Sequence, residues 1–232
     1  MRRIGIIFVV CTGLFSLTAC EKDEDNTMAK AQECLDKANT TTALSCLAIV
    51  DAAGLTSEDS YAVRCSARFI ASGFTASRIA EAASQLSQNT GSKDPALTMM
   101  GMLAFGTVAA AEAAYVDCNL SGSDGFKLFA RAARMGTLIG SAAGSTVLTT
   151  IQNGGTPTPA EIETALNSLR GAGANPATET ALGETALAMS ADTCSTPGEN
   201  AEMCDDINAA IAAGGGNAQA IGAALLNQLN VD

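Results

Sequence analysis

Apolar residues recur at intervals of three and four positions through most of this chain, which is the spacing of one face of an α-helix. Alanine, leucine and methionine supply most of these positions, and runs of β-branched residues are short. The pattern predicts an all-α fold of about nine helices, stacked as antiparallel hairpins in an irregular helical array. The expected stripes include Ala62–Gly73, Ile79–Leu86, Ile162–Leu169, Leu182–Met189, Met203–Ile211 and Ile221–Leu229.

Capping residues and helix breakers set the expected boundaries of these helices. Ser57 followed by Glu58 and Asp59 opens one helix, and Asp94-Pro95 opens another. A capping box at residues 158–161 and Asn175-Pro176 begin two shorter ones. The expected helices are 28–38, 42–53, 57–72, 75–88, 94–118 and 125–151, followed by four shorter helices after residue 157.

Two long segments in the middle of the chain, 96–111 and 135–151, contain no charged residue. Glu112 directly follows the first, and Arg134 directly precedes the second. In the second, Gly136, Gly140 and Gly144 recur every four residues and form a groove of small side chains. A membrane hairpin is one interpretation, but each run is shorter than the ~20 residues that usually span a bilayer. We favour two helices packed tightly in a protein core. A third possibility is an apolar cavity or pore lined by residues 97–105 and 138–148.

The first twenty residues have the three parts of an export signal. Arg2 and Arg3 precede an apolar run over 4–17, and Leu17-Thr18-Ala19-Cys20 follows. This segment resembles the signal of bacterial lipoproteins, whose motif is a leucine, two small residues and a cysteine. The resemblance implies cleavage before Cys20, a diacylglycerol thioether on its sulfur and an acylated amino group. An ordinary cleaved signal and an uncleaved anchor are the alternatives.

The same resemblance suggests a location and a domain organisation. In this family an aspartate directly after the cysteine favours the inner membrane, and Glu21 stands there, so we expect the outer membrane, facing the periplasm. Residues 1–19 would be the signal and 20–27 the lipidated cysteine with an acidic tether. Residues 28–232 would form the helical domain, with acyl chains on Cys20 as its contact with the membrane.

The cysteines agree with export to an oxidising compartment. Six remain beyond Cys20, and six cysteines allow 15 connectivities. Zinc binding is disfavoured because the chain has no Cys-x-x-Cys pair and no histidine. Cys34 and Cys46 lie at equal distances from the turn at 39–41, and Cys194 and Cys204 are close together in sequence. These two pairs leave Cys65 and Cys118 as the third. The expected disulfides are Cys34–Cys46, Cys194–Cys204 and Cys65–Cys118.

Composition disfavours several functions. The net charge of −11 disfavours nucleic-acid partners. The absence of histidine removes the commonest general base and the usual triads. No phosphate-binding loop or nucleophile-elbow motif is present, so we expect a protein without catalytic activity, cofactor or metal. A histidine-free carboxylate site would need two acids that converge in a cleft.

A few charged residues stand out as candidates for a ligand or partner groove. Glu112 is isolated among alanines, and Lys127, Arg131 and Arg134 form a basic stripe at i, i+4 and i+7. One interpretation is a site for an anionic ligand or an acidic partner segment. We favour internal ion pairs with the nearby acids Glu112, Asp117 and Asp124.

The sequence therefore predicts a lipid-anchored helical scaffold of the cell envelope that binds a protein partner. A periplasmic small-ligand-binding or transport accessory protein, with its cavity between the two uncharged segments, is the alternative. The stacked hairpins resemble tetratricopeptide-type repeats in architecture, although the Trp, Tyr and Gly signature and a fixed period are absent.

Overall fold

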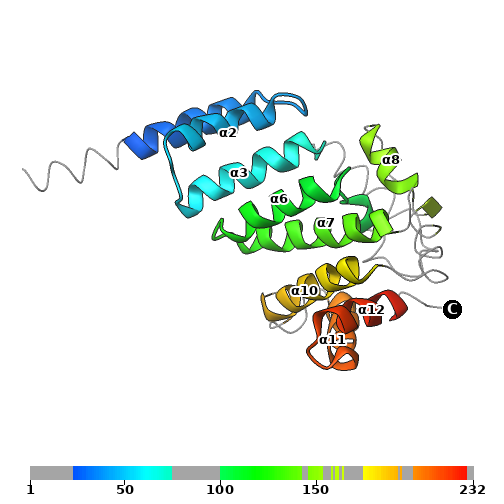
Figure 1. Cartoon of the computed structure of the whole chain (residues 1–232). Coiled ribbons are helices and arrows are strands. Elements are labelled where there is room, and N and C mark those ends of the chain that lie inside the picture. Colours follow the sequence, from blue (N-terminus) through cyan, green and yellow to red (C-terminus); the bar gives the residue numbers. More distant parts are fainter. Residues whose placement is uncertain are drawn as a thin grey trace, which may run out of the picture.

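The computed structural model describes residues 23–74, 100–142, 146–153, 175–192 and 201–228, with positions 158, 160, 161, 164 and 194. Helices are the regular secondary structure of this part of the chain, and it contains no strand. The all-α, disulfide-stapled fold is thus confirmed. Figure 1 shows the helices as successive layers, from the N-terminal hairpin to the C-terminal pair.

Each layer contacts the next in chain order: α2 packs on α3, α3 on α6, α6 on α7, and α7 on α10, which packs on α11 and α12. A first helix over 23–36 precedes these labelled helices. Their bounds are α2 (Ala43–Ala52), α3 (Glu58–Ala71), α6 (Val108–Asn119), α7 (Asp124–Ala142), α8 (Thr146–Gln152), α10 (Pro176–Asp192), α11 (Ala201–Gly214) and α12 (Ala218–Gln228).

Helix 23–36 and α2 form the expected hairpin. Its turn is held by Asn39, whose side-chain oxygen accepts hydrogen bonds from the backbone N–H groups of Thr41 and Thr42 at 2.9 and 3.2 Å. The predicted start at residue 28 is wrong, because the chain is already helical at residue 23. Acidic side chains favour the N-terminal end of a helix, so much of the expected tether is a helical turn.

The predicted helix over 94–118 is interrupted. Residues 103–107 leave the helical path, and α6 begins afresh with Thr107 as its N-cap, which accepts a hydrogen bond from the N–H of Ala110. The buried hydroxyl of Thr137 accepts a hydrogen bond from the N–H of Phe105 at 2.7 Å. This bond from α7 satisfies a backbone group that the break leaves without a helical partner.

The predicted helix over 125–151 is also divided, into α7 and the short α8, which points in another direction in Figure 1. Several local predictions are confirmed. Ser57 caps α3, and the capping box closes with Thr158 N–H donating to Glu161 at 2.7 Å. That backbone bond, with the Thr158 hydroxyl second, lowers the pKa of Glu161. The expected helix over 75–88 lies outside the described residues.

The buried apolar residues form three clusters along the stack. One lies between helix 23–36, α2 and α3, and a second lies between α3, α6 and the start of α7. The third joins α7, α10, α11 and α12. The interrupted segment 102–105 serves two of them, because Met102 and Ala104 enter the third cluster while Leu103 and Phe105 enter the second. The chain turns at this point, with the N–H of Ala104 donating to the carbonyl of Gly101 at 3.1 Å.

Candidate functional site

Phenylalanine is concentrated at one place in this protein. Two of the seven phenylalanines lie in the first twenty residues, and the other five gather in the second cluster. The ring centroid of Phe69 lies 5.0 Å from that of Phe74, 5.2 Å from that of Phe105 and 5.3 Å from that of Phe129. These spacings are within the range in which aromatic rings attract one another.

A pocket of about 610 Å³ opens beside this aromatic cluster. Leu35, Phe69 and Phe74 are buried and form its floor, while the partly exposed Phe126 and Phe129 stand at its sides. The floor and sides come from helix 23–36, from α3 with Phe74 just beyond its end, and from α7. We refer to this cavity as the aromatic pocket; its remaining lining residues are Gln32, Asp36, Ser66, Ile70, Ser123 and Gly125.

Two disulfides hold two of the three helices that line the aromatic pocket. Cys34, next to Leu35, is bonded to Cys46, so helix 23–36 is tied to α2. Cys65, one turn before Phe69, is bonded to Cys118, so α3 is tied to α6. These pairings and Cys194–Cys204 agree with those expected from the sequence. Covalent ties of this kind pre-organise a binding site and reduce the entropy that binding costs.

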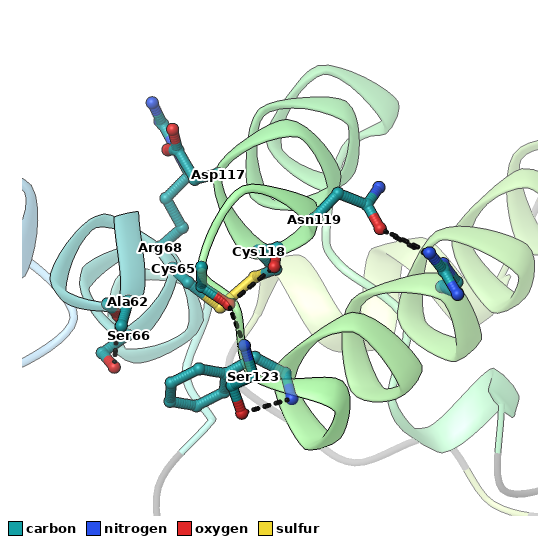
Figure 2. The surroundings of a disulfide bond; sticks show 11 residues. Ala62, Cys65, Ser66, Arg68, Asp117, Cys118, Asn119 and Ser123 are labelled. Carbon is teal, nitrogen blue, oxygen red and sulfur yellow. Dashed lines mark hydrogen bonds and ion pairs between the residues drawn. A yellow bond between two sulfur atoms is a disulfide. The ribbon is translucent and has the colours of Figure 1, made fainter. Parts of the chain in front are cut away.

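Figure 2 shows how closely α3 and α6 are joined around the second disulfide. Arg68 reaches from α3 to Asp117 on α6, one residue before Cys118, and forms an ion pair with it. Asp117 is therefore not a counterion of the basic stripe. The hydroxyl of Ser66, which faces the aromatic pocket, donates to the carbonyl of Ala62 at 2.9 Å.

The charged residues predicted to form a groove make ion pairs and hydrogen bonds with other residues of the helical stack. Arg131 and Arg134 are buried, and both join α7 to α6 and α10. Arg134 also lies over the ring of Tyr115, with its guanidinium carbon 4.2 Å from the ring centroid. Each cation of the stripe has an acidic partner: Lys127 with Asp124 at 3.1 Å, Arg131 with Asp192 at 2.7 Å and Arg134 with Glu112 at 2.7 Å.

We expect Glu112→Ala to lower the free energy of unfolding by about 1–2 kcal/mol, because it leaves a buried guanidinium with fewer partners. Arg134 retains its hydrogen bond to Thr185, which keeps the loss below that of an isolated buried charge. Urea denaturation would measure it. The matched control is Glu184→Ala, whose carboxylate is 58% exposed and 4.0 Å from the same arginine, with an expected effect below about 0.5 kcal/mol. Equal effects of the two variants would contradict this assignment.

The glycine groove is a close contact between backbones. A Cβ atom on Gly136 would lie 1.9 Å from the carbonyl oxygen of Met100, so segment 100–101 is pressed against α7. Gly140 is buried in the same helix, and Gly144 lies outside the described residues. Residues 100–105 are all buried. In the part of the chain that the structure describes, the two uncharged segments meet in a tight seam.

Sequence reasoning did not identify the aromatic pocket. Five phenylalanines in a chain with 4% aromatic residues were a signal of one specialised region, but nothing local indicated that residues 69, 74, 105, 126 and 129 meet. It also did not identify Gly183 and Gly222. Each is an isolated glycine within an expected helix, a position that usually has a packing reason.

The described residues contain no group of three or more Cys, Asp or Glu side chains arranged to hold a metal ion. Among the described helices, none has both the length and the apolar character needed to cross a membrane. Comparisons of the chain with protein-family models, with curated proteins and with solved structures found no match.

Proposed function

We propose that this protein is a non-catalytic binding scaffold of the cell envelope, anchored by acyl chains on Cys20 and facing the periplasm from the outer membrane. The observation that carries the proposal is the aromatic pocket, a concave apolar surface between three helices. Exposed concave apolar surfaces of soluble domains commonly mark binding sites. The partner would be another protein of the envelope.

The position of the aromatic pocket supports a role close to the membrane. Cys20 lies three residues before the start of helix 23–36, and Leu35, in the floor, belongs to that helix. Twelve residues of helix extend about 18 Å, so the lipid and the pocket would be one short helix apart. The two disulfides that tie this helix to α2 and α3 to α6 would keep the pocket in shape at this short distance from the lipid.

A small-ligand-binding or transport accessory protein is the second candidate. The cavity expected between the two uncharged segments is replaced by a tight seam in the described residues, with Gly136 against Met100. The volume of the aromatic pocket, however, falls within the ~300–1,000 Å³ typical of small-ligand sites. This observation keeps ligand binding as an alternative at a different place in the fold.

Site-specific photocrosslinking in cells would test the scaffold. A benzophenone side chain at Gln32, exposed at the rim of the aromatic pocket, is expected to give a discrete protein adduct in the membrane fraction. The same group at Leu187, exposed on α10, is the control and is expected to give none. Intact mass spectrometry of the purified protein should show a chain that begins with an acylated Cys20.

Two results would contradict the proposal. An intact Met1 with unmodified Cys20 would remove the anchor. Adducts of equal yield and size at Gln32 and Leu187 would show that the aromatic pocket does not select a partner.

A further inference from the structure

We infer that the aromatic pocket binds a small organic ligand that has an apolar body and an uncharged or cationic head group able to donate a hydrogen bond. This inference deepens the second candidate function, ligand binding at the aromatic pocket, and rests on that pocket being a binding site; it specifies the chemistry of what enters. It follows from the size of the cavity, from its lining and from the charges around it.

The lining sets the body of the ligand. Of the eleven described residues that line the aromatic pocket, six are phenylalanine, leucine or isoleucine, and four of these six are phenylalanines. The deepest, Leu35, Phe69 and Phe74, offer a ligand only hydrocarbon surface. A polar group placed against them would lose its hydration without a partner, which is costly, so the body of the ligand must be apolar. Aromatic faces also accommodate flat rings.

The polar side chains at the rim set the head group. The Asp36 carboxylate lines the pocket and accepts a hydrogen bond from the Gln32 amide at 3.1 Å. The Ser66 hydroxyl already donates to the Ala62 carbonyl, so its oxygen is left to accept. Asp36 and Ser66 thus supply oxygen acceptors among the residues that line the pocket. They favour a ligand that donates a hydrogen bond.

The charges around the pocket exclude anionic ligands. Among the described residues that line the cavity, one is a carboxylate and none is a lysine or arginine. Two cations directly adjoin lining phenylalanines in sequence: Lys127 follows Phe126 and is paired with Asp124 at 3.1 Å, and Arg68 precedes Phe69 and is paired with Asp117. Lys37, next to Asp36, is paired with Glu33 at 2.6 Å. A sulfonate or carboxylate in the pocket would be desolvated beside Asp36 with no counterion, whereas a cation would be attracted by Asp36 and by the aromatic faces.

Two fluorescent probes with the same body separate these cases. N-phenyl-1-naphthylamine is uncharged and carries an N–H donor, and 1-anilinonaphthalene-8-sulfonate is the same molecule with a sulfonate. The full chain, purified as the cell makes it, is placed in lipid nanodiscs and titrated with each probe against empty nanodiscs. We expect saturable binding of one equivalent of the amine, and binding of the sulfonate at least about tenfold weaker.

Three variants in the same nanodiscs locate the binding. Phe126→Ala removes a partly exposed ring and is expected to weaken binding of the amine about tenfold. Asp36→Asn, at an exposed position, is expected to strengthen binding of the sulfonate about threefold and to leave that of the amine nearly unchanged. Asp25→Asn removes a charge at an exposed position nearer the start of the same helix, outside the described pocket lining, and is the control with no expected effect on either probe.

Several results would overturn the inference. No saturable amine binding, or amine binding that Phe126→Ala leaves unchanged, would show that the aromatic pocket is not the site of such a ligand. Sulfonate binding as tight as amine binding would refute the charge selectivity. If the probes do not bind while the Gln32 crosslink to a protein persists, the ligand class is wrong and the scaffold stands. If the probes bind and no crosslink forms, the scaffold fails and the ligand site stands.

Discussion

Replacing both cysteines of the Cys65–Cys118 pair by alanine is expected to lower the free energy of unfolding by about 4 kcal/mol. The disulfide closes a loop of 53 residues, the longest of the three, and longer loops lose more entropy when they are closed in the unfolded chain. Both cysteines are fully buried, and alanine leaves no polar group unpaired there. Urea denaturation under oxidising conditions would measure the change.

The matched control replaces Cys194 and Cys204 by alanine. The disulfide between them closes a loop of only 10 residues. Its expected loss is about 3 kcal/mol on the same loop-entropy account. Because Cys65 lies one turn before Phe69, the first variant should also weaken the binding of N-phenyl-1-naphthylamine, whereas the control should not. A larger loss of stability in the control would show that loop closure does not set the contribution of these bonds.

Gly183→Ala is expected to lower the free energy of unfolding by about 3 kcal/mol, although alanine is the better helix former. A Cβ atom on Gly183 would lie 1.8 Å from the carbonyl oxygen of Ala218, which is rigid backbone. The two helices, α10 and α12, would have to separate by more than 1 Å, and the apolar contacts of Leu182, Ile221 and Leu225 would loosen. Urea denaturation and the thermal midpoint would both report the loss.

A second contact of this kind has the glycine on α12 and the carbonyl on α10. A Cβ atom on Gly222 of α12 would lie 1.8 Å from the carbonyl oxygen of Glu179 on α10. Because one separation of the helices accommodates both methyl groups, the double variant of Gly183 and Gly222 is expected to lose clearly less than the sum of the single losses. Gly125→Ala is the control: its Cβ would meet only the Ser123 hydroxyl, at 3.9 Å, so we expect no loss of stability. Additive losses would show that the two glycines do not share one contact.

Local signals in the sequence determined much of this fold. The 3.6-residue period, the caps at Ser57, Thr158 and Asn175 and the turn at residues 39–41 act over a few neighbouring residues, so they are readable without a partner. The pairing of Cys34 with Cys46 belongs to this class, because both lie at equal distances from one turn. The export signal and the lipid-attachment motif at Cys20 were likewise local, and the structure leaves both as predictions.

The breaks in the long helices were not readable in this way. Residues 94–118 satisfy a helical pattern, yet Phe105 and Thr107 leave the helix. The break is stabilised by the Thr137 hydroxyl, 32 residues away, and by two clusters that draw alternate side chains of 102–105 in opposite directions. Burial against distant helices outweighed local propensity.

The sequence by itself determined the helical class, the disulfide pairs and the charges that would need partners. Only the tertiary structure decided which ion pairs form: Asp117 pairs with Arg68, and Arg131 pairs with Asp192. The aromatic pocket also belongs to the tertiary structure. Its phenylalanines are spread from residue 69 to residue 129, and a concave surface exists only where three helices fix the distances between them. Periodicity gives the direction of a side chain around its own helix, whereas a cavity depends on how separate helices pack.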